Sequence, residues 1–334
     1  MNKYLRLALG IGVSATCLFL AFRGVPVGEL WKLAQDLPLR FPLFYVGVAS
    51  VNLFLRAARW RVLLTGNDSI PFGTVFAVNC VGQLGNSVLP ARLGDLFRAT
   101  NLTRSGTSSS FSLATIFVER VFDAGFLVLV GAAAAPFVGK LPEWLLHASG
   151  VVGIVALLGL AFIFALPFFE APFLRLLQGV LPRGWQNLAT ALIEQFVLGL
   201  RSIHRMEAIL AFLALTVCIW FLDGFGIWIL VVATGSTVPP AVVALLLMSL
   251  ALSSAIPAAP GNAGVFQVVA VTVLAPFGVG RSAALFFSLI WQALIVINLL
   301  LWGLGSLWFL TSRKLLVTAG FRRAHPIPAD TEPL

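Results

Sequence analysis

The sequence predicts an all-α, polytopic integral membrane protein, and three observations carry this prediction. Hydrophobic residues make up 59% of the chain and charged residues only 10%, with a mean hydropathy of +0.99. Such a chain has too little polar surface to cover a soluble globule. The apolar residues also form stretches long enough to cross a bilayer core of about 30 Å, and most basic residues lie between these stretches. We therefore treat residues 1–334 as a single transmembrane domain.

Eight apolar stretches follow one another along the chain. Six are continuous and predict full transmembrane helices, at residues 5–22, 41–64, 110–137, 145–169, 207–233 and 282–311. Two are interrupted by proline and glycine, at residues 71–90 and 238–277. The segment 170–206 interleaves basic and apolar residues, which predicts an amphipathic helix on the cytoplasmic membrane surface.

The basic residues indicate the orientation, because cytoplasmic segments of membrane proteins carry an excess of lysine and arginine. We expect a cytoplasmic location for both termini and for the basic regions 56–61, 92–104 and 175–205. The sparsely charged segments 138–144 and 234–240 are expected outside. The loop 23–40 is then also outside, although it contains Arg23, Lys32 and Arg40.

The two interruptions share one sequence pattern. Ser87–Asp95 and Ser254–Asn262 both read Ser-apolar-apolar-Pro-Ala-x-x-Gly-Asx, and they lie half the length of the chain apart. Proline removes a backbone donor and glycine permits a sharp turn, so each pattern breaks a helix. We expect two broken, re-entrant helical hairpins. Each hairpin enters and leaves the membrane on one side, the first on the cytoplasmic side and the second on the outer side.

The displacement that superimposes Ser87 on Ser254, here called the half-chain shift, also aligns the segment 41–137 with the segment 207–311. In the expected topology the span 41–64 runs inward and its counterpart 207–233 runs outward, so the two segments form inverted repeats. Paired broken helices at matching positions of such repeats indicate a transporter whose substrate binds near the middle of the membrane.

The span 110–137 carries three ionisable residues, Glu119, Arg120 and Asp123. An ionisable residue in mid-helix costs about 2.5–3.5 kcal/mol on insertion scales, so each one needs a partner or a function. Glu119 and Asp123 share one helix face and need a nearby cation. The candidates are Arg120, Arg56, Arg59, Arg92, Arg98, or a bound proton or ion. Two interpretations stay open, a structural ion-pair network and a polar path for a substrate or coupling ion.

Arg56 and Asp223 occupy equivalent positions under the half-chain shift. Both lie near the middle of their spans, and their charges are opposite. They either pair with one another across the repeat axis or each pair with another residue.

The first break offers a site for an anion. Arg92 and Arg98 flank Gly94 and Asp95, and we expect a helix to start here with Asp95 as its N-cap. Free amides at a helix N-terminus and adjacent guanidinium groups both favour a phosphate, which we place at Arg92 or Arg98. Basic residues beside anionic lipid are also ordinary determinants of topology.

The second break contains no charged residue, and we expect Asn262 to cap the helix that follows it. It therefore predicts a neutral, glycine-rich gate. Its predicted substrate-contacting residues are Pro257, Pro260, Gly261, Gly264 and Gln267.

Several other functions are excluded or disfavoured by the sequence. The formal net charge of +9 is explained by membrane orientation rather than by nucleic-acid binding. The three cysteines and three histidines show no metal-ligand spacing, and no nucleotide-binding motif occurs. We expect neither catalysis nor a metal or cofactor.

The chain contains four distinctive motifs: Arg-x-x-Arg-Trp at 56–60, Leu-Pro-Ala-Arg-Leu-Gly-Asp-Leu-Phe-Arg at 89–98, Glu-Arg-x-x-Asp at 119–123 and Pro-x-x-Pro-Gly-x-x-Gly at 257–264. Together these motifs resemble the flippase-like transmembrane module of lysylphosphatidylglycerol synthases. The resemblance covers essentially the whole chain and includes members without the soluble aminoacyl-transfer domain. It implies movement of a phospholipid or lipid-linked headgroup between leaflets of a prokaryotic inner membrane. Family members often have Glu where this chain has Gln267.

We therefore predict a flippase for an anionic or aminoacylated phospholipid or a lipid-linked intermediate. Two alternatives are a non-transporting membrane partner that presents lipid to a separate synthase, and a secondary transporter of a small solute or ion. The expected substrate path comprises Arg56, Arg59, Arg92, Gly94, Asp95, Arg98, Glu119, Arg120, Asp123, Asp223, Pro257, Pro260, Gly261, Gly264 and Gln267.

Overall fold

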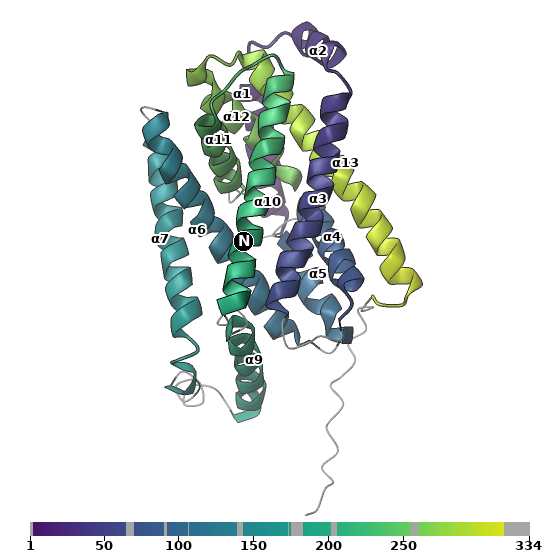
Figure 1. Cartoon of the computed structure of the whole chain (residues 1–334), viewed down its shortest axis with the longest axis vertical. Helices are drawn as coiled ribbons and strands as arrows, with labels where there is room; N and C mark the ends of the chain where they lie inside the picture. The colour runs from purple at the N-terminus through teal and green to yellow at the C-terminus, as the bar shows by residue number, and fades with distance from the viewer. Residues whose placement is uncertain are drawn as a thin grey trace, which may run out of the picture.

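The protein is all-α, as predicted (Figure 1). The computed structural model describes residues 3–64, 70–89, 92–105, 107–138, 143–172, 174, 183–201, 206–254 and 260–316. Within these ranges the chain is built from helices joined by short connections and contains no strand.

The first half of the chain contributes a helical hairpin between long helices. Its elements are α1 (Lys3–Phe22), α2 (Val27–Asp36), α3 (Arg40–Leu63), α4 (Phe72–Val88), α5 (Leu93–Asn101), a 3₁₀ turn at Leu102–Ser105, α6 (Ser109–Ala134) and a 3₁₀ turn at Ala135–Phe137. The hairpin of α4 and α5 corresponds to the first predicted break.

The second half of the chain also contributes a pair of short helices between long helices. Its elements are α7 (Glu143–Ala165), α9 (Arg183–Arg201), α10 (Met206–Ala233), α11 (Pro240–Ser253), a 3₁₀ turn at Pro260–Asn262, α12 (Val265–Leu274), a 3₁₀ turn at Ala275–Phe277 and α13 (Arg281–Ser312). The pair α11 and α12 corresponds to the second predicted break.

Three of the described helices are long and apolar enough to cross a membrane: α3, α10 and α13. A fourth span results if the last part of α1, Gly12–Phe22, and α2 are counted together, although they are bent by 81°. The protein is therefore a multi-pass membrane protein, while the number of six full crossings stays a prediction.

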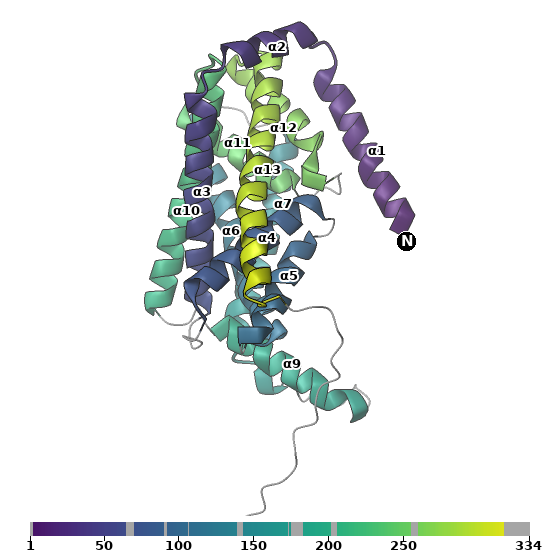
Figure 2. The ribbon, with the colours of Figure 1, turned by 90° about the vertical axis from the view of Figure 1, so that its right-hand side faces the viewer.

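Helices α3 and α10 lie side by side and run in opposite directions (Figures 1 and 2). Tyr45 near the start of α3 packs against Gly226 near the end of α10. Further along α3, Asn52 donates to the carbonyl of Ile219, and Arg59 donates to Thr216. Residue numbers rise along α3 as they fall along α10, so the two helices are antiparallel.

The packing of the remaining helices follows the same correspondence. Helix α4 packs against α13, and α11, its counterpart under the half-chain shift, packs against α6. Each break also folds into its own hairpin, α4 against α5 and α11 against α12. These pairings are those expected of inverted repeats at 41–137 and 207–311, and the repeats themselves stay a prediction.

Glycine allows α4 and α5 to approach closely. A Cβ atom on Gly94 would collide with the Gly82 carbonyl oxygen, and one on Gly85 would lie 3.0 Å from the Gly94 Cα. A Cβ atom on Gly82 would in turn collide with the Arg98 side chain. This backbone contact places the side chains of α5 against α4 and α6, where the charged residues lie.

Two segments outside the repeats differ from the expectation or add to it. The region 23–40, expected to be a loop, contains the helix α2, which lies across one end of the bundle (Figure 2). Helix α9, at the opposite end, lies within the predicted amphipathic segment 170–206. It also packs against α6, because Val197 and Leu200 are buried in a shared apolar cluster.

We predict that Gly94→Ala destabilises the protein strongly, because the new methyl group collides with rigid backbone of α4. Overpacking typically costs about 1–3 kcal/mol, and a collision with backbone should reach at least the upper end. Thermal unfolding of the detergent-solubilised protein, followed by tryptophan fluorescence, measures the effect.

Gly73→Ala is the matched control, because Gly73 also lies in α4 but its Cβ position meets nothing within 4 Å. This control should keep or slightly raise the melting temperature, since alanine favours helix more than glycine. Equal melting temperatures for the two variants would contradict the glycine contact.

Candidate functional site

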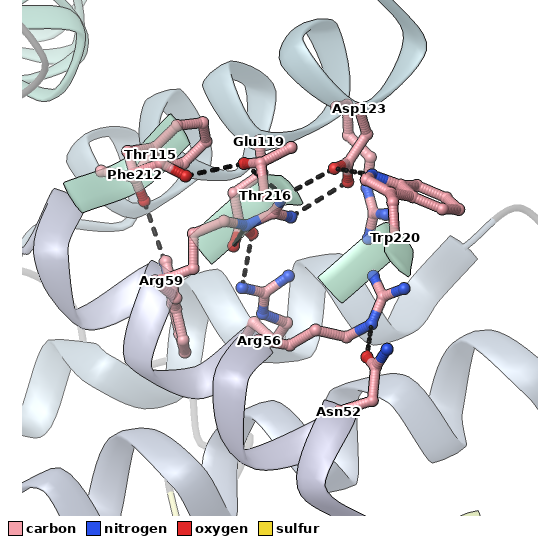
Figure 3. Close-up of polar contacts among 12 residues, drawn as sticks. Asn52, Arg56, Arg59, Thr115, Glu119, Asp123, Phe212, Thr216 and Trp220 are labelled. Carbon is pink, nitrogen blue, oxygen red and sulfur yellow. Dashed lines mark hydrogen bonds and ion pairs between the residues drawn. The ribbon is translucent and has the colours of Figure 1, made fainter. Parts of the chain in front are cut away.

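The centre of the bundle holds an ion pair between α3 and α6 (Figure 3). The Arg59 guanidinium donates to both carboxylate oxygens of Asp123, from Nη1 at 2.6 Å and from Nη2 at 3.0 Å. Trp220 of α10 donates its indole N–H to the same carboxylate at 3.0 Å. The exposed fractions are 3% for the Arg59 side chain and 8% for Asp123. This bidentate pair and the Trp220 hydrogen bond tie three helices together in the buried interior of the bundle.

Glu119 lies between two arginines. Its Oε2 accepts a hydrogen bond of 2.7 Å from Arg98 Nη2, and its Oε1 lies 3.7 Å from Arg59 Nε. The Arg98 guanidinium also stacks 4.1 Å from the centre of the Trp60 ring, a favourable cation–π contact. Arg98 is therefore buried and paired within the protein, and this structure does not present its guanidinium to a ligand.

Asp95 pairs with Arg120 rather than capping a helix. Helix α5 begins at Leu93 with Arg92 at the N-cap position, so the prediction of Asp95 as the N-cap is wrong. The Asp95 carboxylate accepts hydrogen bonds from Arg120 Nη2 at 2.9 Å and from the Asn86 amide at 3.0 Å. The physical reason is that a charged partner from α6 binds the carboxylate more strongly than a free backbone amide does.

Arg56 and Asp223 form the pair that the half-chain shift allowed. Arg56 Nη2 donates to Asp223 Oδ2 at 2.7 Å, and Asn52 donates to the other carboxylate oxygen at 2.9 Å. Arg56 Nε also donates to Asn52 at 2.7 Å. The exposed fractions of 18% for Arg56 and 30% for Asp223 exceed those of the Arg59–Asp123 pair. This pair therefore lies closer to the outer surface of the bundle.

Arg92 differs from the other four arginines of this region. Its side chain is exposed and pairs with no carboxylate of the described residues. Arg92 Nη2 donates instead to the Ser254 hydroxyl at 3.0 Å. Its backbone is left-handed, with φ 53° and ψ 42°, a conformation that a non-glycine residue rarely adopts. Arg92 thus bridges the end of the first break to the start of the second.

The second break is neutral, and the side-chain amides of two glutamines connect its turn to the helices that follow. The Gln267 side chain accepts from the Gly264 N–H at 2.6 Å and donates to Gln292 at 2.7 Å, and Gln292 donates to the Gly261 carbonyl at 2.6 Å. Gly264, with φ 89°, is the N-cap of α12, so the expectation that Asn262 caps this helix is wrong.

Glycine is required at Gly264 for two reasons. Its φ is positive, and a Cβ atom there would collide with the Ser14 carbonyl of α1.

The remaining predicted residues of the second break precede α12 in the sequence. Pro260 begins the 3₁₀ turn that contains Gly261. Pro257, also predicted to contact substrate, lies outside the described residues.

The two breaks meet at Arg92 and Ser254, and the charged side chains around this junction do not cancel. The central arginines are Arg56, Arg59, Arg92, Arg98 and Arg120, and the central carboxylates are Asp95, Glu119, Asp123 and Asp223. Each carboxylate has an arginine partner, so one positive charge is left at Arg92. No group of three or more possible metal ligands occurs in the described part of the chain. The arrangement is suited to holding an anion.

Several partners in this network were not predicted, because they are neutral. Asn52, Trp220 and Gln292 each bind one of the predicted residues or its immediate neighbourhood. The sequence could have predicted one of these partners, Asn52, because it lies four residues before Arg56 on the same helix face.

Residues 7–303 match the transmembrane region of lysylphosphatidylglycerol synthases. The chain belongs to this family. It is 23% identical over 240 residues to a UPF0104 membrane protein of Methanocaldococcus jannaschii, an alignment that covers 69% of this chain and 95% of that protein. It is 29% identical over 295 residues to the glycosyltransferase AglD of Haloferax volcanii, covering 76% of this chain and 46% of AglD. The matched region thus spans about half of AglD. No solved structure matches the chain.

We predict that Asp123→Ala destabilises the protein more than Asp223→Ala. Removing Asp123 leaves the buried Arg59 without its main partner, which typically costs about 3–5 kcal/mol. Arg56 is less deeply buried than Arg59, and it keeps its hydrogen bond to Asn52 when Asp223 is removed, so a smaller part of its interactions is lost. Unfolding in mixed micelles with increasing SDS measures both differences.

The double variant Arg59→Ala/Asp123→Ala should recover part of the loss, because neither charge is then left alone. Equal losses of stability for Asp123→Ala and Asp223→Ala would contradict this assignment. So would a double variant that loses as much stability as Arg59→Ala and Asp123→Ala lose together.

Proposed function

We propose that the protein moves an anionic lipid between the two leaflets of the membrane and holds the lipid phosphate at Arg92. The observation that carries the proposal is the uncompensated charge of Arg92 at the junction of the two breaks. A phosphate there would replace the single hydrogen bond to the neutral Ser254 hydroxyl by bidentate hydrogen bonds between opposite charges.

The surroundings of Arg92 favour a lipid over a small solute. Val88, Leu89, Leu93 and Leu96, which lie on either side of Arg92, are all exposed large apolar residues. A cation flanked by exposed apolar side chains complements an amphiphile, because the phosphate can bind the guanidinium while acyl chains lie along the leucines. A small soluble anion would leave those side chains unused.

The four paired carboxylates have a different role in this proposal. Their ion pairs tie α3, α5, α6 and α10 into one frame and position the first break. Arg98, Arg59 and Arg120 belong to this frame. Alternating access then results when the hairpins α4–α5 and α11–α12 open in turn around the headgroup.

The expected location is the cytoplasmic membrane of a prokaryote, with both termini in the cytoplasm. Under this orientation the first break opens toward the cytoplasmic leaflet and the second toward the outer leaflet.

A second candidate function is supported by one comparison. The matched region forms only part of AglD, a protein named as a glycosyltransferase, so a module of this family can occur in the same chain as another activity. By analogy, this chain would present a lipid to a separate lipid-modifying synthase without transporting it.

We predict that Arg92→Ala lowers lipid transport at least about tenfold while leaving the melting temperature nearly unchanged, because the exposed Arg92 contributes little to packing. The measurement uses proteoliposomes with fluorescent phosphatidylglycerol and an impermeant quencher, which scores the lipid that reaches the protected leaflet. Arg92→Lys should retain part of the activity, since it keeps the charge but loses the bidentate geometry.

Arg40→Ala is the matched control, because it removes an exposed arginine from the first turn of α3. Its transport rate should equal that of the wild type. Equal rates for Arg92→Ala and the wild type would refute the headgroup site. Lipid binding without any transport, together with copurification of a synthase, would favour the second candidate.

A further inference from the structure

Helix α4 carries a stripe of amide side chains that leads away from the first break. Asn79, Gln83 and Asn86 follow one another at spacings of four and three residues, which places them on one helix face. At 1.5 Å per residue the stripe extends roughly 10 Å along the helix. Its C-terminal end, Asn86, binds Asp95, close to Arg92.

The deeper part of this stripe has no partner within the described part of the protein. The Asn79 side chain is 1% exposed, yet neither its Nδ2 nor its Oδ1 has a hydrogen-bond partner there. Gln83, which is partly exposed, forms no hydrogen bond with the described residues. A buried amide without a partner is costly, above all in a membrane, where water is scarce. These amides are therefore suited to a polar group that enters from the first break.

Amides of the second break lie next to the same end of α4. A Cβ atom on Gly261 would lie 3.4 Å from Gln292 Nε2 and 3.8 Å from the Ser87 carbonyl oxygen. Gln292 is in turn bonded to Gln267. The junction of the breaks is thus surrounded by neutral donors and acceptors, with Arg92 as its charged member.

No carboxylate of the described residues is available there for a positively charged headgroup. Asp95, Glu119, Asp123 and Asp223 are each bound to an arginine, and Gln267 is an amide. An ammonium group would have to break one of these pairs and leave an arginine unpaired. The site therefore disfavours an aminoacylated lipid.

We propose that the transported lipid carries a neutral, hydroxyl-rich group, such as a sugar or a cyclic polyol, attached to its phosphate. The phosphate binds Arg92, and the hydroxyl groups bind Asn79 and Gln83. An amide both donates and accepts hydrogen bonds, as a hydroxyl does, so the two are complementary. The proposal deepens the transport function above and rests on the same Arg92 site.

The test compares three lipids with identical acyl chains on the purified full-length protein in nanodiscs. Phosphatidylinositol supplies a phosphate with a neutral polyol, phosphatidic acid a phosphate alone, and lysylphosphatidylglycerol a phosphate with ammonium groups. Competition binding against a fluorescent phosphatidylglycerol should rank phosphatidylinositol about ten- to a hundredfold ahead of each of the other two, the gain expected of two hydrogen bonds that contribute about three- to tenfold each.

Two variants isolate the amides. Asn79→Leu and Gln83→Leu should each reduce the preference for phosphatidylinositol over phosphatidic acid by about three- to tenfold, without changing the affinity for phosphatidic acid. Asn79→Leu should not lower the melting temperature, because it replaces an unpartnered amide by an apolar group of similar size. Gln35→Ala, on the exposed surface of α2, is the control and should change nothing.

The outcomes separate this inference from the transport function. Equal affinities for the three lipids, tightest binding of lysylphosphatidylglycerol, or an unchanged preference in both amide variants would overturn the inference while leaving the Arg92 site in place. Equal binding by wild type and Arg92→Ala would overturn the headgroup site and this inference together.

Discussion

The structure depends on the pairing of arginine with carboxylate inside helices that are otherwise apolar. An unpaired charge buried among transmembrane helices is costly. Each carboxylate therefore fixes the position of an arginine on another element. Asp123 fixes α3 against α6, Glu119 fixes α5 against α6, and Asp223 fixes α10 against α3. These contacts join the first hairpin to the long helices, and the cysteines of the described residues, Cys17, Cys80 and Cys218, are free.

The same constraint separates structural charge from functional charge. Once Asp95, Glu119, Asp123 and Asp223 are paired, Arg92 is the arginine of this group that lacks a carboxylate. It lies where the two breaks meet, its backbone is left-handed and its side chain is exposed. The buried pairs thus give the fold its rigidity, and the break carries the exposed charge. The amides of α4, α12 and α13 add hydrogen-bonding groups around this charge.

The sequence predicted those features that follow from local chemistry. Proline and glycine located both breaks, and the half-chain shift gave the pairing of Arg56 with Asp223 as one of two alternatives, which is the one that the structure forms. Features that depend on tertiary contacts were missed. Asp95 was expected to cap α5, but Arg120 reaches it from α6. Gly264 caps α12 instead of Asn262, because only a glycine fits against α1. Nothing in the sequence distinguished the buried Arg98 from the exposed Arg92, since both lie in one short polar run.

A structure of the protein in lipid nanodiscs, determined by cryo-electron microscopy with a bound phospholipid, tests the central claim most directly. We predict phosphate density within hydrogen-bond distance of the Arg92 guanidinium, acyl chains along Leu93 and Leu96, and all four carboxylates still paired with arginine. Phosphate density at Arg98 or Arg59, with the pairs to Glu119 or Asp123 broken, would contradict the account. It would show that the buried network binds the ligand itself.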